Sequence, residues 1–302
     1  MMKDTKLILA VLTVAVVWGT TFLGIKIGVE TIPPWFVAGF RQLIAAFLLL
    51  IYLVFTKNLK WIGRKNFIIQ IILSSLMLII ANGLTTVAEQ TISSSLTALI
   101  SSMSPIMIFI GSMIFGMEKF SFRSLIGLTL GFSGAILIFW NAFEELTNPA
   151  YLTGIILLFL AIAGWASGTI FTKKIHLKSG NIFLNLFYQF AFAGVVQLIF
   201  AFLFSDSYDY ENWSARSIAA TVYLAVFGSV AAYFAFNYAL KKLDPSKVGM
   251  LSYVNTIIAI FLGWLVLDEE ISAKFIIAAI LIISGVFLMN FKKVERIKRE
   301  SA

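Results

Sequence analysis

Long apolar stretches dominate the chain. Eight of them contain no charged residue, and two more carry a single charge near their start, Arg41 and Lys274. A membrane-spanning helix needs about 20 mainly apolar residues, whereas a spanning β-strand shows about ten residues of alternating polarity, a pattern that does not occur here. The sequence therefore predicts an all-α polytopic membrane protein with ten transmembrane helices. These are expected at Leu7–Ile25, Pro34–Phe55, Asn66–Ala88, Gln90–Met117, Ser124–Phe143, Asn148–Thr172, Ser179–Ser205, Ser217–Leu240, Val248–Leu267 and Ser272–Phe291.

The first segment resembles a signal peptide in its charged start. We read it as a transmembrane helix, because no A-x-A-like cleavage site follows it and nine similar segments do.

The connections between the segments carry their charges asymmetrically. One alternate set of loops, together with both termini, holds 19 of the 23 Lys and Arg residues, whereas the opposite loops hold three. By the positive-inside rule, both termini are expected in the cytoplasm, with the chain in the plasma (inner) membrane. The net charge of +8 then reports orientation in the lipid bilayer, and no nucleic-acid partner is expected.

Composition excludes several classes of protein. Residues of the set AVILMFWYC make up 60% of the chain, charged residues make up 13%, and the mean hydropathy is +0.95. A soluble domain has about 25% charged residues, so a cytosolic enzyme, a disordered protein and a secreted domain are all excluded. There is no cysteine and one histidine, His176, so no catalytic residue, metal site or cofactor is expected.

Internal similarity divides the chain into two halves, residues 1–143 and 144–302. The sequence WGTTF at 18–22 is echoed by WASGT at 165–169, 147 positions later, and Glu118 and Gly134 match Glu269 and Gly285 at a spacing of 151. Each half then contains five helices, an odd number, so the halves are expected to have opposite orientations. Such inverted repeats are typical of secondary transporters, which bind substrate near the midplane between the repeats.

Several of these motifs resemble those of a known family, the ten-helix EamA-like transporters of the drug/metabolite transporter superfamily. The matching features are the WGTTF motif, Arg41 after Pro33-Pro34, Ser104-Pro105, Glu118, and the series Gly127, Gly131 and Gly134. The second half departs from this pattern, since Thr256 replaces the proline, Ala278 replaces the first glycine and the seventh segment has no arginine. The resemblance implies export of small metabolites, often amino acids.

Arg41 is the only charge well inside a predicted span. A charge at that depth is costly unless it faces the interior of the bundle or water, so Arg41 is a candidate for binding a substrate carboxylate. The alternative is an arginine that snorkels to the nearby membrane surface or caps a helix.

Aromatic and amide side chains inside the spans are the other candidate substrate ligands. Trp18 and Trp165 lie at corresponding positions of the two halves, away from the segment ends where interfacial tryptophans gather, although ordinary packing explains them equally well. The remaining polar candidates are Asn82, Tyr233, Asn237, Tyr253 and Asn255; their alternative role is interhelical hydrogen bonding.

Three further features concern motion and coupling. Pro105 interrupts the fourth segment and is a candidate gating hinge or a static kink. Glu89, between the third and fourth segments, is the best candidate for a proton-coupling carboxylate, with a solvated loop charge as the favoured alternative. Glu118 and Glu269 precede the fifth and tenth segments and are expected to cap those helices.

Taken together, these features predict a secondary transporter, most simply an exporter, that moves small metabolites such as amino acids by alternating access. A membrane-embedded lipid-modifying enzyme and a passive channel are the alternatives. The enzyme would require acids or histidines deep in the spans, where none occurs, and the channel a continuous polar stripe. Whether the protein is a monomer or a homodimer stays open.

Overall fold

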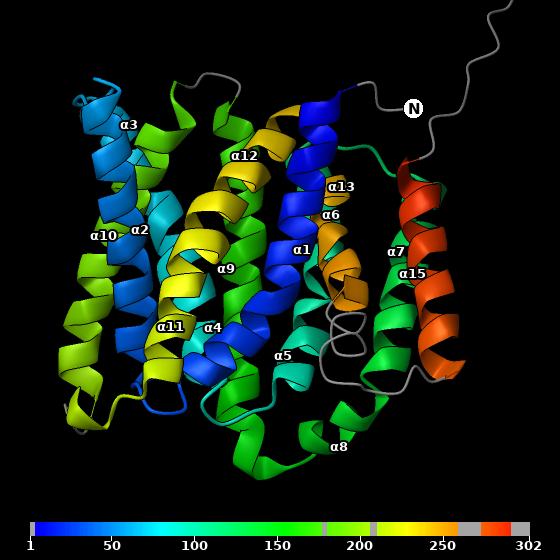
Figure 1. The fold of residues 1–302 in the computed structure, drawn as a ribbon. Coiled ribbons are helices and arrows are strands. Elements are labelled where there is room, and N and C mark those ends of the chain that lie inside the picture. Colours follow the sequence, from blue (N-terminus) through cyan, green and yellow to red (C-terminus); the bar gives the residue numbers. More distant parts are fainter. Residues whose placement is uncertain (1–3, 177–179, 206–209, 259–272, 291–302) are drawn as a thin grey trace, which may run out of the picture.

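The computed structural model describes residues 4–176, 180–205, 210–258 and 273–290. Every regular element in these ranges is a helix, and the helices stand side by side in a single bundle (Figure 1). The start of α1 and the end of α15 lie at the same end of the bundle, at the top of the view. The prediction of an all-α polytopic fold is confirmed.

The first half of the chain alternates between long helices and short connecting turns. Its elements are α1 (Thr5–Gly28), α2 (Pro34–Phe55), α3 (Arg64–Ser74), η1 (Ser75–Gly83), α4 (Leu84–Ala88), α5 (Ser94–Ser101), α6 (Ser104–Ile114), α7 (Phe122–Ile138), η2 (Trp140–Ala142) and α8 (Phe143–Leu146). The described part of the second half contains η3 (Pro149–Tyr151), α9 (Leu152–His176), α10 (Ile182–Phe204), η4 (Tyr210–Asn212), α11 (Ala215–Tyr223), η5 (Leu224–Ala231), α12 (Ala232–Lys242), α13 (Pro245–Gly249) and α15 (Ala273–Asn290).

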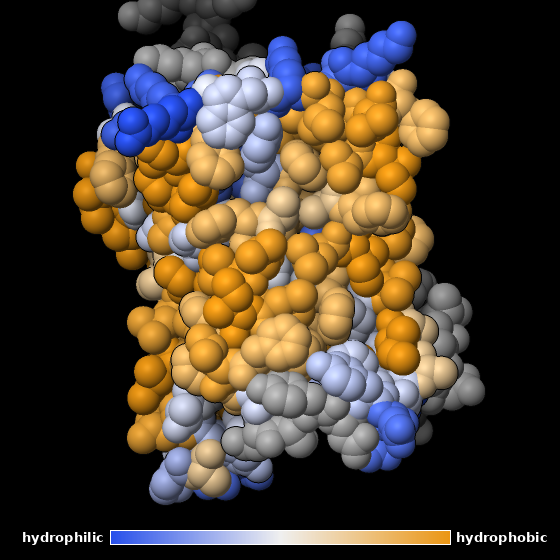
Figure 2. All heavy atoms as spheres, turned by 90° about the vertical axis from the view of Figure 1, so that its left-hand side faces the viewer, coloured by the Kyte–Doolittle hydropathy of each residue, from blue (hydrophilic) through white to orange (hydrophobic). Residues whose placement is uncertain are grey.

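Within the described ranges, seven helical spans are long and apolar enough to cross a membrane. Two shorter apolar helices, α7 and α15, accompany them. The ninth predicted segment begins as helix at 251–258 and continues outside the described residues. On the face shown in Figure 2, apolar side chains cover the middle and polar side chains gather toward the two ends, as expected for a protein surrounded by lipid.

The fourth predicted segment is broken where a single helix was expected. The chain turns at Ser102 and Met103, between α5 and α6. Pro105 occupies the first turn of α6, where its missing N–H would have no intrahelical partner in any case. The Ser102 hydroxyl donates to the Leu99 carbonyl oxygen at 2.5 Å, which satisfies one group freed by the break.

The glycine series of α7 lets that helix approach α15 closely, as the sequence predicts for these residues. A Cβ atom on Gly127 would lie 2.8 Å from the Gly285 carbonyl oxygen, and one on Gly134 would lie 2.8 Å from the Ala278 carbonyl oxygen. Gly127 and Ala278 are 151 positions apart, as are Gly134 and Gly285. The two contacts are therefore related crosswise, as across a two-fold axis.

The α2 and α10 helices show the same crosswise relationship at a different spacing. A Cβ on Gly39 would lie 2.7 Å from Leu198 Cδ2, and one on Gly194 would lie 2.6 Å from Leu43 Cδ2. The sequences around them, AGFRQLIAAF at 38–47 and AGVVQLIFAF at 193–202, match at seven of ten positions when aligned 155 apart. This similarity was not detected from the sequence, because the halves were compared only at spacings of 147 and 151.

Two lysines make matching contacts at opposite ends of the bundle. Lys26 Nζ donates to the carbonyl oxygens of Glu89 and Ile92, at 2.7 and 3.0 Å. Lys173 Nζ donates to those of Leu240 and Leu243, both at 2.8 Å. The lysines are 147 positions apart and each acceptor pair is 151 apart, so we call these contacts the lysine clamps. Each clamp ties the end of a long helix to the carbonyl groups at the end of another.

Glu118 does not cap its own helix, contrary to the prediction. Ser121 caps α7, since its hydroxyl accepts from the Ser124 N–H at 3.5 Å. The Glu118 carboxylate instead accepts from the backbone N–H of Ser246, at 3.0 Å, and from its hydroxyl. It therefore joins the two halves at the start of α13, because free N–H groups at a helix start attract a carboxylate. Its counterpart, Glu269, lies outside the described residues.

Candidate functional site

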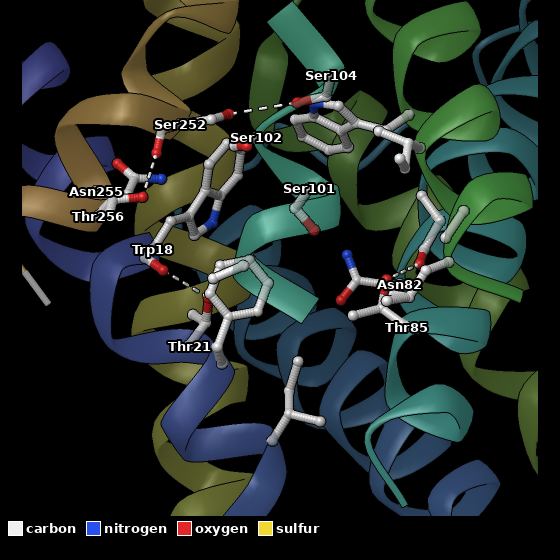
Figure 3. Close-up of a pocket in the computed structure, with 18 of the residues that line it drawn as sticks. Trp18, Thr21, Asn82, Thr85, Ser101, Ser102, Ser104, Ser252, Asn255 and Thr256 are labelled. Carbon is white, nitrogen blue, oxygen red and sulfur yellow. Dashed lines mark hydrogen bonds between the residues drawn. The ribbon is translucent and has the colours of Figure 1, made fainter. Parts of the chain in front are cut away.

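A cavity of about 140 Å³ lies inside the bundle, between elements of both halves (Figure 3). Six of the eight predicted ligand residues line it: Trp18, Arg41, Asn82, Trp165, Tyr233 and Asn255. The lining also contains hydroxyl residues that the sequence reasoning did not assign to substrate, namely Thr21, Thr85, Ser101, Ser102, Ser104, Ser252 and Thr256. The signal for some of them was present, since Ser101, Ser102 and Ser104 cluster around Pro105.

The two tryptophans face one another across the boundary between the halves. Their ring centroids are 5.1 Å apart and the rings meet edge to face, an arrangement that aromatic pairs favour. Trp18 Nε1 donates to the Gly228 carbonyl oxygen at 3.1 Å, which fixes its ring against η5. The pair presents a mostly apolar surface to the cavity, suited to an apolar part of a ligand.

Asn82 and Tyr233 also meet across this boundary. The Asn82 amide donates to the Tyr233 hydroxyl at 2.8 Å, and that hydroxyl donates to the Met77 carbonyl oxygen at 3.3 Å. Met77 and Asn82 belong to the π-helical element η1, and Tyr233 follows the π-helical η5. Such stretches are rare and occur often at functional sites.

Arg41 is buried, with 3% of its surface exposed, and does not snorkel to the membrane surface. Its Nε donates to the Ser229 hydroxyl at 2.9 Å. Within the described ranges it forms no ion pair and is the only charged residue in the cavity lining. A lone guanidinium in this position is able to hold a carboxylate.

Asn255 completes the polar part of the lining. When its amide nitrogen faces the neighbouring carbonyl oxygens, it donates to Leu251 at 2.7 Å and to Ala15 at 3.1 Å. Ser252, one turn earlier, lies 3.5 Å from the Ser104 hydroxyl. These contacts tie α1 and α6 to the helical residues 251–258.

Two predicted ligand residues lie elsewhere. Tyr253 is fully buried against α7, where its ring fills the space beside Gly131 and its hydroxyl lies 3.4 Å from the Leu128 carbonyl oxygen. Asn237 donates to the Tyr233 carbonyl oxygen at 2.8 Å and lines a separate cavity of about 10 Å³, which suffices for little more than a water molecule. Pro105 lies outside the cavity lining, although its neighbour Ser104 belongs to it.

Glu89 is not the solvated loop charge that the sequence favoured. Its side chain is fully buried, and neither carboxylate oxygen has a hydrogen-bond partner among the described residues. Burial raises the pKa of this carboxyl well above its usual range, and the positive charges of Lys26 and Arg41 only partly oppose that effect. The burial arises because the α4 helix ends inside the bundle, against α9.

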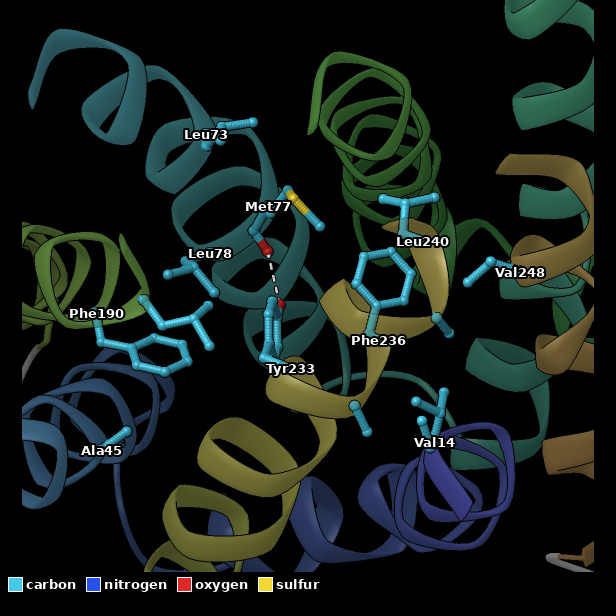
Figure 4. Packing of buried hydrophobic residues seen from close by; sticks show 14 of the residues in the cluster. Val14, Ala45, Leu73, Met77, Leu78, Phe190, Tyr233, Phe236, Leu240 and Val248 are labelled. Atoms are coloured by element: carbon cyan, nitrogen blue, oxygen red, sulfur yellow. Dashed lines mark hydrogen bonds between the residues drawn. The ribbon is translucent and has the colours of Figure 1, made fainter. Parts of the chain in front are cut away.

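An apolar cluster closes one side of the cavity. The cavity lining includes residues 18–25 of α1 and residues 158–165 of α9. Because the two helices run in opposite directions, both stretches lie in the half of the bundle where α1 ends (Figure 1). On the other side pack Val14, Phe236, Leu240, Val248 and Leu251, with both tryptophans against them (Figure 4). We call this group the closing cluster; it separates the cavity from the side on which α1 begins.

Within the described ranges, no three residues of the types His, Asp and Glu gather into a group that could hold a metal ion. The candidate site is therefore a cavity with one cation, several hydroxyls and amides, and an aromatic wall.

Comparison with known proteins identifies this architecture. The model of the EamA-like transporter family matches residues 5–140 and again residues 152–291. The chain belongs to the EamA-like transporter family. Its relatives include the uncharacterized transporter YoaV of Bacillus subtilis, 26% identical over 95% of this chain and 97% of YoaV. They also include the uncharacterized inner membrane transporter YedA of Escherichia coli, 29% identical over 94% of this chain and 90% of YedA.

A solved structure shares the fold of this EamA-like transporter. It superposes with a TM-score of 0.77 over 93% of this chain and 96% of its own, at 16% sequence identity. As a member of the EamA-like transporter family, the protein is a multi-pass membrane transporter. Its relatives bear the names of transporters, which is consistent with a non-enzymatic role.

Proposed function

We propose that the protein carries small amphipathic metabolites, amino acids among them, across the plasma membrane by alternating access. The observation that carries this proposal is the position of the cavity. Trp18 meets Trp165, and Asn82 meets Tyr233, at spacings of 147 and 151. A residue touches its own counterpart only near a two-fold axis, so the cavity lies on the axis that would relate the two halves.

The crosswise glycine contacts and the lysine clamps support two five-helix repeats, residues 1–143 and 144–302, in opposite orientation. Two such repeats exchange conformations to open a central site to one side and then to the other. The closing cluster blocks one side here, which favours a carrier over a passive channel. With the termini in the cytoplasm, this conformation faces outward. Export is the direction that the resemblance to metabolite exporters implies.

The composition of the cavity limits the cargo. A volume of about 140 Å³ accommodates a small metabolite, with Trp18 and Trp165 against its apolar part. Arg41 and Asn82 offer donors to a carboxylate, while hydroxyl and carbonyl oxygens accept from an amine. An amino acid with an apolar side chain meets these requirements.

The test is saturable counterflow in proteoliposomes that contain the purified protein and a panel of unlabelled metabolites inside. Trp18→Ala should lower the initial rate at least about tenfold, since it removes a buried aromatic wall. Trp140→Ala is the matched control, because Trp140 is exposed on the bundle surface. Flux that fails to saturate with substrate would indicate a channel, and no protein-dependent flux across the panel would overturn the proposal.

A further inference from the structure

Arg41 and Glu89 are buried charges in the first half that have apolar counterparts in the second. The alignment at a spacing of 155 pairs Arg41 with Val196, while Gly39 pairs with Gly194 and Gln42 with Gln197. Both helices make the corresponding close contact, Gly39 of α2 with Leu198 and Gly194 of α10 with Leu43. Helix packing at this position is thus compatible with valine, and the arginine is not needed for it.

The same comparison applies to Glu89, whose counterpart is Leu240. The lysine clamp forms on the carbonyl oxygen of Glu89 in one half and on that of Leu240 in the other. Leucine supports the same backbone geometry, so the carboxylate of Glu89 is not required by the clamp. Its presence in a fully buried position calls for another explanation.

The surroundings of Glu89 leave its carboxylate unbalanced. Among the described residues, the charged groups whose fields reach it are Lys26 on α1 and Arg41 on α2. Lys26 Nζ already donates to two backbone carbonyl oxygens, and Arg41 Nε donates to Ser229. None of the ion pairs among the described residues includes Glu89. A buried carboxylate without a partner is far less costly when it is protonated.

Protonation of Glu89 leaves Arg41 as the uncompensated charge beside the cavity. The cavity lining described here contains no carboxylate that would balance the guanidinium. A ligand that enters it with one negative charge compensates the charge of Arg41, whereas a cation adds to the excess of positive charge. Binding of a proton at Glu89 and binding of an anion at Arg41 therefore favour each other.

We propose that Glu89 is a proton-binding site coupled to Arg41, and that the transporter moves an amphipathic organic monoanion together with one proton. The proton passes from water on the loading side to a Glu89 carboxylate oxygen, and it leaves to water on the other side when the anion leaves Arg41. The movement is electrically neutral, and no covalent bond other than O–H forms or breaks. This inference rests on the proposed carrier function and adds its substrate charge and its coupling.

The experiment uses proteoliposomes of the full chain with labelled 3-phenyllactate as the probe anion. Unlabelled phenylalanine and phenethylamine serve as zwitterionic and cationic competitors with the same aromatic body. Protein-free liposomes give the passive diffusion of the neutral acid, which is subtracted. A gradient of about one pH unit, alkaline inside, should drive the anion inward to a limit of about tenfold, since one pH unit corresponds to about 1.4 kcal/mol.

Four variants separate coupling from folding. Glu89→Gln and Glu89→Leu, the latter copying Leu240, should lose the accumulation driven by the pH gradient, while exchange of internal for external 3-phenyllactate falls far less. Glu30→Gln should behave as wild type, because Glu30 is an exposed carboxylate paired with Arg216. Arg41→Gln should abolish the preference for 3-phenyllactate over phenethylamine. Clamping the membrane potential at different values should leave wild-type accumulation unchanged.

The outcomes distinguish this inference from the proposed function. Accumulation by Glu89→Gln equal to that of the wild type, dependence on membrane potential, or stronger competition by phenethylamine than by phenylalanine would each overturn the coupling and leave the carrier intact. Absence of protein-dependent flux for all three compounds would overturn the carrier and the inference with it.

Discussion

Asn82 donates a 2.8 Å hydrogen bond to the hydroxyl of Tyr233, the residue 151 positions later in the chain. Two residues at corresponding positions of the halves thus form one polar contact at the wall of the cavity. They differ in kind, an amide facing a phenol, so the pair gives the cavity wall two chemically different sides. A carrier needs that asymmetry to orient a ligand, and the halves supply it through single substitutions.

Removal of this hydrogen bond should weaken ligand binding more than it weakens the fold. Tyr233→Phe keeps the ring among Trp18, Trp165 and Phe190 but leaves Asn82 without its acceptor. We expect a loss of about 0.6 kcal/mol in stability, the average for hydrogen bonds between membrane helices, and a reorientation of Asn82 in the cavity. A double-mutant cycle with Asn82→Ala, measured by thermal unfolding and by ligand affinity, gives the coupling energy. Additive effects of the two substitutions on affinity would show that the pair does not act as a unit.

The close approach of α7 to α15 makes a second prediction. A Cβ on Gly127 would lie 2.8 Å from the Gly285 carbonyl oxygen, and one on Gly134 would lie 2.8 Å from the Ala278 carbonyl oxygen. Gly127→Ala should therefore force the helices apart and destabilise the protein by about 1–3 kcal/mol, as overpacking does. Leu125→Ala, an exposed position on the same helix, should change stability little. Equal unfolding temperatures for the two variants would contradict the structure at this interface.

Glu118 offers a test of the contact between the halves. Its carboxylate accepts two hydrogen bonds from Ser246, so Glu118→Gln should weaken both and cost about 1 kcal/mol of stability. Glu144→Gln, at an exposed carboxylate of α8, is the control. Equal stability of the wild type and Glu118→Gln would show that the carboxylate does not stabilise the start of α13.

The positions of the helices follow from the sequence, because each helix that crosses the lipid needs a long apolar stretch. The expected segment Pro34–Phe55 coincides with α2, and the end of Asn66–Ala88 coincides with that of α4, since apolar length alone sets such bounds. The same requirement does not predict which side chains of a helix face the cavity. Asn237 and Tyr233 are one helical turn apart, yet only Tyr233 reaches the cavity. Which neighbour a polar group meets depends on tertiary packing.

Glu89 shows the same limit for charged residues. Its place between two apolar segments is that of a loop residue, and the favoured interpretation was a solvated charge. The structure buries it because the α4 helix ends inside the bundle and Lys26 reaches over that end to the backbone. By contrast, the sequence does contain the similarity between AGFRQLIAAF and AGVVQLIFAF. It becomes visible when the two halves are also compared at a spacing of 155.

The orientation of the chain can be tested directly because the sequence contains no cysteine. Lys119 lies in the connection between α6 and α7, and Glu144 lies on α8 at the opposite end of the bundle (Figure 1). Under the positive-inside rule, the Glu144→Cys side chain should react with a membrane-impermeant maleimide added to intact cells, and the Lys119→Cys side chain should react only after the membrane is opened. The reverse result would invert the direction assigned to the closing cluster.

The raised pKa of Glu89 predicts how ligand binding depends on pH. Below the raised pKa the carboxyl is protonated, and Arg41 is left to attract an anion. As the pH rises through that pKa, the carboxylate forms, and its field opposes the anion at Arg41. The affinity for 3-phenyllactate should therefore fall with increasing pH in the wild type and stay flat in Glu89→Gln. Quenching of tryptophan fluorescence measures the affinity, because Trp18 and Trp165 line the cavity. An affinity that rises with pH in the wild type would place the controlling charge elsewhere than Glu89.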